Sequence, residues 1–356
     1  MKLITCEQVS AGHPDKICDQ IADAIVTDCL QHDPNSRVAI ECLAKDEHII
    51  IAGELTSSHE PNYPELVLST LNRIGWEKLN YGDKVVGGPQ IHTLVKRQSP
   101  DIALGVDKGG AGDQGMMYGY ATNETPELLP IPFVIATKFL ELLAQHPSPM
   151  FMADAKAQVS FDYDCGKITT FLCSVQHKMD VDPADFREIV ESLMVLAASE
   201  YGLNTDFQKL VNPTGRFTIG GAMADCGVTG RKLACDTYGG VGHIGGGAMS
   251  GKDPSKVDRS GAYMARKIAR DIVLAGYADK CEVQIAYAIG LPDPVSVYVE
   301  CFGTEHQDKR LIEEYVKDSY DLTPRGIIQN LDLLNVDYNR VSSGGHFGKE
   351  NLPWEM

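Results

Sequence analysis

The chain has 356 residues, of which 43% are hydrophobic and 23% charged, as expected of a folded protein large enough for two or three domains. Its formal net charge of -17 argues against general binding to nucleic acids or to anionic membranes. No apolar run is long enough to span a membrane, and the first residues lack a signal-peptide core, so we expect a cytoplasmic protein. The 10 cysteines form no C-x-x-C pair, so we expect them to be reduced thiols.

A first amphipathic helix is predicted over residues 14–30, opened by the sequence Gly-His-Pro-Asp-Lys. A helix N-terminus favours anions, and the Asp15 carboxylate is a ligand that Mg²⁺ prefers, so a phosphate and a metal ion could bind here. Helix capping by His13 and complementation of the helix dipole by Asp15 would explain the same residues equally well. Asp19 and Asp23 continue this face of the helix and are predicted to be solvated.

Three segments share one pattern, in which two β-rich runs around a polar turn are followed by a helix. The predicted hairpins span residues 37–56, 157–177 and 282–302. The helices that follow them are predicted over residues 64–74, over 183–199 and from about 309. The pattern predicts three similar α+β units, and a coincidental order of common elements is the alternative.

Two stretches are rich in glycine, at residues 105–119 and 212–232. The first shows little apolar periodicity, which predicts a mobile loop that could act as a lid, although an interdomain linker would have the same composition. In the second, dense glycine indicates a backbone folded closely around a ligand. Arg231 and Lys232 could bind phosphate oxygens there, and Phe217 could stack on a base. An irregular turn would explain the glycines but not the basic pair.

The stretch GGGAMSGK at residues 245–252 fits the phosphate-binding pattern G-x-x-x-x-G-K, but Asp253 follows where that pattern has Ser or Thr. Its glycines and lysines predict a phosphate cradle at the start of a helix over 256–274, with Asp253 as the N-terminal cap of a helix start. The missing hydroxyl would otherwise hold Mg²⁺, so Asp15 and Asp258 are the expected metal ligands. Complementation of the helix dipole is the alternative for Asp258.

Residue chemistry alone leaves two interpretations open. One is an ATP-using transferase or kinase, and the other is a nucleotide-binding module without catalysis. No Ser-His-Asp, Cys-His or paired-carboxylate pattern stands out. Spacing alone does not distinguish Glu41, Glu54, Gln98 or residues 154–156 as functional, and a structural role is the commoner explanation for each.

Together these motifs resemble the methionine adenosyltransferases, also called S-adenosylmethionine synthetases. The resemblance covers residues 5–354 and rests on five motif regions: 12–16, 110–115, 212–221, 225–232 and 245–260. It implies an α+β fold of three pseudo-threefold-related domains, each a β-sheet with helices packed on one face. The implied domains span residues 3–101, 110–218 and 220–356, with a flexible active-site loop at 98–108.

The resemblance also implies a reaction and an assembly. ATP, L-methionine and water would give S-adenosyl-L-methionine, phosphate and diphosphate, with two Mg²⁺ ions per site and K⁺. The methionine sulfur would attack C5′ of ATP in line, and the released triphosphate would then be hydrolysed. Because sulfur is already a competent nucleophile, catalysis would rest on positioning and on neutralising the triphosphate charge. The enzyme would work as a homodimer or homotetramer with its sites at the subunit interface.

Roles for individual residues follow from the same resemblance. ATP would be bound by His13, Asp154, Ala155, Lys156, Arg216, Phe217, Asp225, Arg231, Lys232, Ala248 and Lys252. Methionine would be bound by Glu54, Gln98, Asp225 and Lys256. The metal ligands would be Asp15 and Asp258 for Mg²⁺ and Glu41 for K⁺. The catalytic residues would be His13, Lys16, Lys156, Arg231, Lys232 and Lys252.

The sequence departs from the family pattern at three places. The loop before Gly110 is shorter than in typical bacterial members, Ile244 stands where a histidine is usual, and the usual C-terminal helix is absent before Met356. The rival interpretations are an ATP-dependent small-molecule kinase, which would release ADP, and an inert nucleotide-binding homologue. Intact Lys156, Lys252 and Asp258 argue against the inert homologue.

Overall fold

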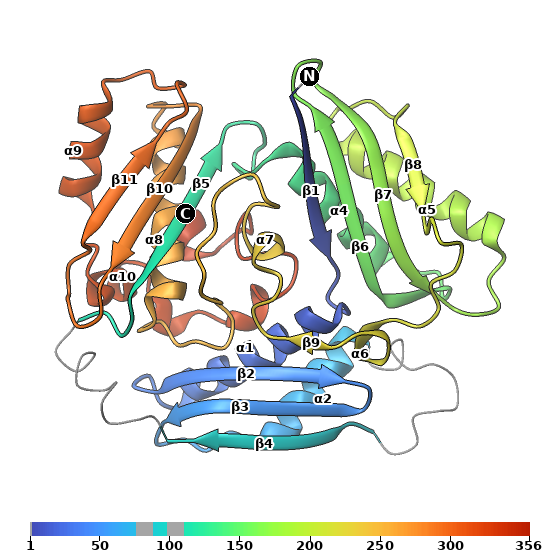
Figure 1. The fold of residues 1–356 in the computed structure, drawn as a ribbon, viewed down its shortest axis with the longest axis horizontal. Helices are drawn as coiled ribbons and strands as arrows, with labels where there is room; N and C mark the ends of the chain where they lie inside the picture. Colours follow the sequence, from blue (N-terminus) through green and yellow to red (C-terminus); the bar gives the residue numbers. More distant parts are fainter. Residues whose placement is uncertain (1, 76–87, 98–109) are drawn as a thin grey trace.

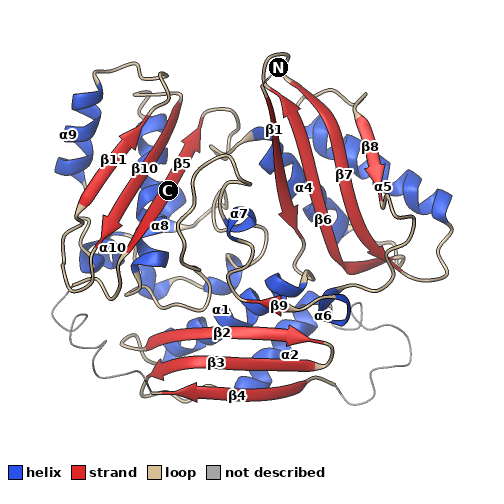
Figure 2. Ribbon diagram, viewed as in Figure 1, coloured by secondary structure: helices blue, strands red, loops and turns tan. Residues whose placement is uncertain are grey.

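The structure, a computed structural model, describes residues 2–75, 88–97 and 110–356. Three sheets stand around a common centre, and each has helices on one face (Figure 1, Figure 2). The predicted α+β class with three pseudo-threefold-related domains is confirmed. In the part of the chain that the structure describes, no helix is both long and apolar enough to cross a bilayer.

The N-terminal sheet, at the bottom of Figure 1, has the strand order β4-β3-β2-β9. Its strands are β2 (Arg37–Lys45), β3 (His48–Thr56), β4 (Gln90–Lys96) and β9 (Gly227–Val228). The predicted hairpin is confirmed as the antiparallel pair β2–β3, while β4 runs parallel to β3. Val38, Ile40 and Cys42 alternate into the core because successive strand residues face opposite sides. The helices of this domain in the described residues are α1 (Pro14–His32) and α2 (Tyr63–Ile74).

The central sheet has the order β1-β6-β7-β8, and its predicted hairpin is confirmed as β6–β7. Its strands are β1 (Leu3–Val9), β6 (Phe151–Asp162), β7 (Lys167–His177) and β8 (Gln208–Val211). Its helices are α4 (Ile131–Gln145) and α5 (Pro183–Glu200). Between helices and sheet, Phe139 and Phe171 pack edge to face with ring centroids 5.2 Å apart.

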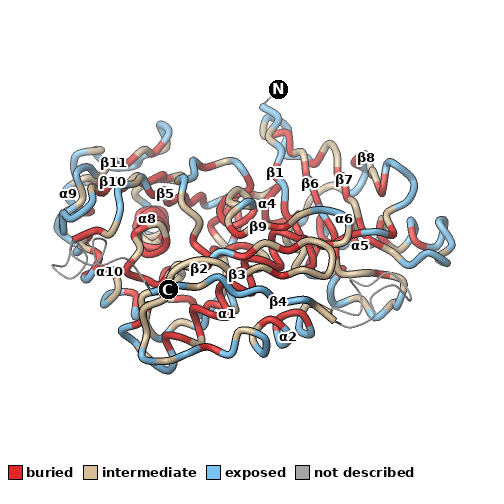
Figure 3. Tube along the Cα trace, turned by 60° about the horizontal axis from the view of Figure 1, so that its bottom comes forward, coloured by how far each residue is buried: buried red, intermediate tan, exposed pale blue. Residues whose placement is uncertain are grey.

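The C-terminal sheet has the order β11-β10-β5 with antiparallel pairing throughout. Its strands are β5 (Gly115–Thr122), β10 (Lys280–Tyr287) and β11 (Ser296–Glu300). Its helices are α8 (Val257–Leu274), α9 (Lys309–Ser319) and α10 (Pro324–Asn330). In Figure 3, α8 is largely buried, whereas the outer side of α9 is exposed. The short helices are α6 (Gly221–Ala224), α7 (Leu233–Asp236), η2 (Leu333–Asn335), η3 (Tyr338–Arg340) and η4 (Pro353–Glu355).

The three sheets exchange strands in a closed cycle. The N-terminal strand β1 pairs with β6 in the central sheet, and β5, which precedes the central hairpin, pairs with β10 in the C-terminal sheet. The cycle closes where β9 pairs with β2 of the N-terminal sheet. The sheets are therefore not made of consecutive residues. The predicted domains 3–101, 110–218 and 220–356 are consecutive stretches of sequence, and their boundaries remain predictions.

The predicted mobile loop over residues 105–119 is wrong in its second half. Residues 105–109 lie outside the described part, as does the active-site loop predicted at 98–108, but β5 already begins at Gly115. Gly119 is in β5 because α8 crosses it closely: a Cβ at this position would lie 1.9 Å from the carbonyl carbon of Ala265. Here glycine indicates close packing of a helix on a strand.

The predicted capping role of Asp253 is also wrong. The helix α8 begins at Val257, and its N-cap residue Lys256 makes no side-chain capping bond. Asp253 is buried, and its carboxylate accepts hydrogen bonds from the backbone N–H groups of Val38 at 2.7 Å and Ser255 at 2.9 Å, and from the Lys256 ammonium. Asp253 therefore holds the glycine-rich stretch against β2.

Candidate active site

The strand exchange brings three distant segments together at the start of α1. The backbone N–H of Ser10 donates to the carbonyl of Ala155 at 2.9 Å, which places the start of α1 beside β6. On its other side lies β9, where a Cβ at Gly227 would be only 2.1 Å from the carbonyl oxygen of Pro14. The predicted motifs at 12–16, 154–156 and 225–232 therefore meet, because glycine allows direct contact between the backbones.

Asp15 is the buried acid at this junction. Its Oδ1 accepts from the N–H of Val228 at 2.9 Å, its Oδ2 accepts from the Lys232 ammonium at 2.7 Å, and Arg231 lies 3.5 Å away. Burial alone would raise the pKa of Asp15, but the hydrogen bonds from Lys232 and Val228 outweigh it and the pKa falls below its usual value. Asp15 is thus an ionised carboxylate held between backbone and cations.

His13 is the N-cap of α1, so the capping interpretation is confirmed for this residue. Its Nδ1 accepts from the N–H of Asp15 at 3.2 Å. Burial, together with the positive charges of Lys232 and Lys156, lowers the pKa of His13 to about 3. The imidazole is therefore neutral near pH 7, and its proton is on Nε2, where it can be donated to a ligand.

The first half of β6, an inner strand of the central sheet, contributes the residues predicted to contact ATP at 154–156. Asp154 is buried, and its Oδ2 accepts from the N–H of Gly221 at 2.8 Å, while its Oδ1 has no hydrogen-bond partner in the described structure. Burial raises the pKa of Asp154 to about 6. Ala155 is buried and its N–H donates to the Ser10 hydroxyl at 2.8 Å, whereas Lys156 is exposed. Among the residues that the structure describes, this part of β6 therefore offers an acceptor without a partner and an exposed cation.

Hydrogen bonds that involve backbone groups position Phe217 and Asp225. Phe217 pairs with His177 at the end of β7, with its carbonyl accepting at 2.9 Å, and its side chain is half-buried. Asp225 is exposed and accepts from the N–H of Cys226 at 2.8 Å. Arg216, next to Phe217, is exposed as well. All are accessible to a ligand.

Lys16 lies apart from these accessible groups. It is 1% exposed, and its ammonium donates to Asp19 at 2.9 Å and to Asp236 of α7. Burial alone would lower the pKa of Lys16, but the two carboxylates raise it. The structure thus uses Lys16 to hold α1 to α7, which the prediction of a charge-neutralising role did not anticipate.

The predicted solvation of Asp19 and Asp23 is wrong, because both side chains are fully buried. Asp23 is paired with Arg259 of α8 and accepts from the N–H of Gly251 at 2.9 Å. These acids are buried because other parts of the chain surround α1 where the domains meet. The spacing of apolar residues in the sequence cannot reveal this burial. The one sequence signal was their spacing from Asp15 along the same face.

A second charged pair lies at the start of α8. The Lys252 ammonium donates to Asp258 Oδ2 at 2.6 Å. A Cβ at Gly247 would lie 2.1 Å from the carboxyl carbon of Asp258, so the glycine stretch packs directly on this side chain. Asp15 and Asp258 each occupy the second residue of their helix, and α1 and α8 occupy equivalent places in two of the three repeats. The pseudosymmetry therefore produces two similar acid–lysine pairs.

The cradle predicted at 245–252 lies along β2. The N–H of Ile40 donates to the carbonyl of Gly251 at 2.9 Å, and the N–H of Thr229 donates to the carbonyl of Cys42 at 3.0 Å, so both basic stretches flank this strand. Beside it is a cleft of ≈ 340 Å³. Its lining includes Glu41, Gly53, Ala248 and Lys252.

The remaining residues of interest lie next to residues of this cleft, at a second pocket or outside the described part of the chain. Glu54 is half-buried and follows Gly53 on β3. Lys256 is half-buried and bound to Asp253, and Ile244 is exposed at a small pocket that also contains Asp258. Gln98 lies outside the described residues. The predicted residues thus form two neighbouring groups, one at the start of α1 and one along β2 and α8.

In architecture, the chain is an α+β protein of three pseudo-threefold-related domains with charged residues gathered where the domains meet. Family models match almost all of it: the S-adenosylmethionine synthetase N-terminal domain at 1–100, central domain at 108–217 and C-terminal domain at 219–356. The chain is also 44% identical to a protein of Mesoplasma florum named S-adenosylmethionine synthase, over 100% of this chain and 97% of that protein. The chain belongs to the S-adenosylmethionine synthetase family. It is therefore a transferase of S-adenosylmethionine synthesis that uses ATP.

Proposed function

We propose that this protein forms S-adenosyl-L-methionine from ATP, L-methionine and water by in-line attack of the methionine sulfur on C5′ of ATP. The released triphosphate is then hydrolysed to phosphate and diphosphate. The observation that carries the proposal is the pair of acid–lysine contacts, Asp15–Lys232 and Asp258–Lys252, at the starts of two pseudosymmetric helices. A group that leaves as a whole triphosphate needs cations along its length, and these contacts supply them.

The two aspartates fit Mg²⁺. Each is a carboxylate that binds an ammonium group in the structure, so each already accommodates a cation. Asp15 and Asp258 would hold two Mg²⁺ ions per site, and the lysines could then turn to phosphate oxygens. When bound, Mg²⁺ would supply charge neutralisation on the departing triphosphate.

The neighbouring residues support the binding of the nucleotide. His13 would donate from Nε2 to a phosphate oxygen, and Lys156, Arg231 and Lys232 would add positive charge. The free Oδ1 of Asp154 would accept a hydrogen bond from the nucleoside. Phe217 would stack on the adenine and Arg216 would lie beside it, while Ala155 and Ala248 would contact ATP through their backbone and methyl groups. Lys16 would act at a distance, by fixing α1.

Methionine would bind through ion pairs between its two charged groups and side chains of opposite charge. Glu54 and Asp225 would attract its ammonium group and Lys256 its carboxylate, and Gln98, outside the described residues, would complete this subsite. Glu41 is exposed at the cleft along β2 and would be the K⁺ ligand. Carboxylate oxygen is a suitable ligand for such a hard cation.

We further propose a cytoplasmic homodimer or homotetramer with active sites at the subunit interface. Large apolar side chains are exposed on strands of the N-terminal and C-terminal sheets, among them Leu94, Met116 and Tyr298. Such exposure on sheet faces favours a protein interface. All 10 cysteines are free thiols, in keeping with a reducing compartment. Light scattering of the purified protein would give the number of subunits, and a monomer would contradict this part.

The reaction is tested by incubating the protein with ATP, methionine, Mg²⁺ and K⁺ and identifying the products by mass. A sulfonium product with phosphate and diphosphate is expected. A kinase would release ADP, and an inert homologue would release nothing. Either of those results would overturn the proposal.

A further inference from the structure

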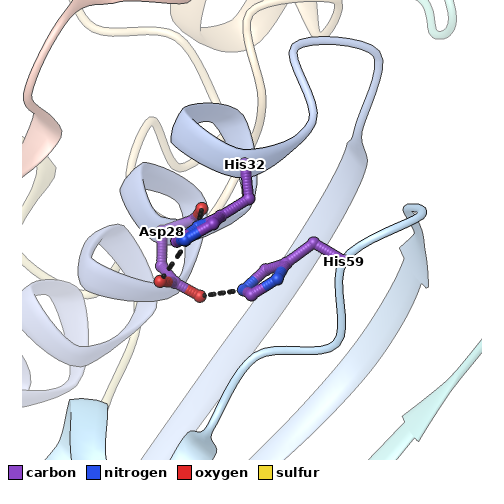
Figure 4. Close-up of side chains that lie close together, drawn as sticks. All are labelled: Asp28, His32 and His59. Atoms are coloured by element: carbon purple, nitrogen blue, oxygen red, sulfur yellow. Dashed lines mark hydrogen bonds and ion pairs between the residues drawn. The ribbon is translucent and has the colours of Figure 1, made fainter.

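Three side chains of the N-terminal domain form a cluster of potential metal ligands at the end of α1 remote from Asp15 (Figure 4). Asp28 and His32 are four residues apart on the last turn of α1, so they lie on one face of the helix. His59 comes from the loop after β3. One ligand atom from each residue lies within 4.8 Å of the others.

The three side chains already contact one another. Asp28 Oδ2 is 2.7 Å from Nε2 of His59, and Asp28 Oδ1 is 3.5 Å from Nδ1 of His32. The two imidazole rings are stacked, with centroids 4.0 Å apart and planes 12° from parallel. The carboxylate is therefore shared by two imidazoles that come from different elements of the fold.

A backbone hydrogen bond fixes the tautomer of His32. Its Nδ1 lies 2.9 Å from the carbonyl oxygen of Asp28, which can only accept, so Nδ1 carries the proton. The lone pair is then on Nε2 and is free to bind a metal ion. Metal-binding histidines commonly donate their second ring N–H to such a carbonyl, because this contact orients the ring.

The loop that carries His59 is held in place without help from the cluster. Asp33, the C-cap residue of α1, accepts hydrogen bonds from the N–H of Ser58 at 2.8 Å and from its hydroxyl at 2.9 Å. The N–H of His59 donates to the Ser57 hydroxyl at 3.0 Å. These bonds fix the loop against the end of α1, so an ion can bind without movement of the backbone, once the stacked imidazole rings turn their ring nitrogens toward it.

The charge and donor types select the kind of ion. The C-terminus of a helix carries a partial negative charge, which favours a cation beside His32. Two imidazole nitrogens and one carboxylate oxygen suit Zn²⁺, whereas Mg²⁺ and Ca²⁺ prefer oxygen ligands alone. The His32 side chain is 54% exposed, so an ion can enter from solvent and keep a water as a further ligand. Asp28 is about 20 Å along α1 from Asp15, given a rise of about 1.5 Å per residue.

We propose that Asp28, His32 and His59 form a Zn²⁺ site that clips the C-terminal end of α1 to the loop between β3 and α2. The ion takes the place of the proton between Asp28 and His59 Nε2, and through solvent exchange the imidazole then carries its proton on Nδ1, so the bound ring is neutral. The site is structural and takes no part in the reaction at the other end of α1. Binding of Zn²⁺ therefore stabilises the N-terminal domain.

The test is a calorimetric titration of the full-length protein with Zn²⁺ in excess Mg²⁺, which saturates sites built from oxygen ligands alone. The wild type is expected to bind one Zn²⁺ tightly per chain. His59→Ala and Asp28→Asn are each expected to weaken this binding by at least about 10-fold, because each removes a ligand. Circular dichroism of each variant verifies that it is folded.

A matched control uses the other close histidine pair of this domain. Nδ1 of His48 and Nε2 of His92 are 3.1 Å apart on β3 and β4. The double variant His48→Ala/His92→Ala is expected to keep the tight Zn²⁺ site, and its melting temperature should still rise when Zn²⁺ is added. His59→Ala should lose both the tight site and this rise in melting temperature. Equal affinity in His59→Ala and wild type, or loss of the site in the double variant, would overturn the proposal. These readouts do not depend on the proposed reaction.

Discussion

Replacement of Lys252 by alanine tests the acid–lysine pair at the start of α8. The ammonium donates to Asp258 at 2.6 Å, and removing it deletes one preformed donor from the charge-neutralising set. Loss of one such donor commonly lowers kcat by about 10²–10³-fold, equivalent to about 2.7–4 kcal/mol of transition-state stabilisation. The Lys252 side chain is 24% exposed, so losing its ion pair should cost less than about 1 kcal/mol of folding free energy. The backbone bridge between Lys252 and Ala39 does not depend on the side chain.

The assay combines S-adenosylmethionine formation at saturating substrates and Mg²⁺ with urea unfolding of the same preparation. Lys317→Ala is the matched control, because Lys317 is an exposed lysine near the end of α9. We expect Lys252→Ala to lose turnover at nearly unchanged stability and Lys317→Ala to retain both. Turnover within about threefold of the wild type would refute the role of Lys252 in neutralising the triphosphate.

Three further predictions concern buried groups. Arg259→Met leaves the buried carboxylate of Asp23 without its charged partner and should lower the unfolding free energy by about 3–5 kcal/mol in urea denaturation. Gly119→Ala places a methyl group against the backbone of Ala265, so we expect a lower melting temperature, and an unchanged one would contradict the close packing of β5 on α8. The pKa of Asp154 is raised to about 6, so its contribution to stability is present below about pH 4 and lost as pH rises through 6. Asp154→Asn should therefore be more stable than the wild type at pH 7.5, by up to about 3 kcal/mol, and equal stability at every pH would contradict the buried environment.

The hairpins and helices were predictable from the sequence because their signals are local. Alternating apolar residues around a polar turn identified β2–β3, and the same pattern identified β6–β7. The exchange of strands was not predictable, because β9 has only two residues and its partner β2 is far away in sequence. Gly119 was misread for the same reason: composition cannot tell a flexible glycine from one that lies beneath a crossing helix.

The candidate site was predictable where the motif itself holds the chemistry. Asp15, Lys232, Lys252 and Asp258 were all named from their motifs, and the structure pairs them. The burial of Lys16 was not foreseen, because the ion pairs that surround it join residues far apart in the chain. A buried charge needs its partner to be stable, and only the tertiary structure shows which partner is near.

The cyclic exchange of strands has a consequence for biosynthesis. The strand β1 emerges first from the ribosome but its partner β6 begins at Phe151, and β2 waits still longer for β9 at Gly227. Contacts this distant in sequence close slowly, and an unpaired strand edge can join to a neighbouring chain. The nascent protein therefore cannot complete its first sheet until most of the polypeptide has been translated, and we expect it to depend on chaperones longer than a chain whose domains fold in succession.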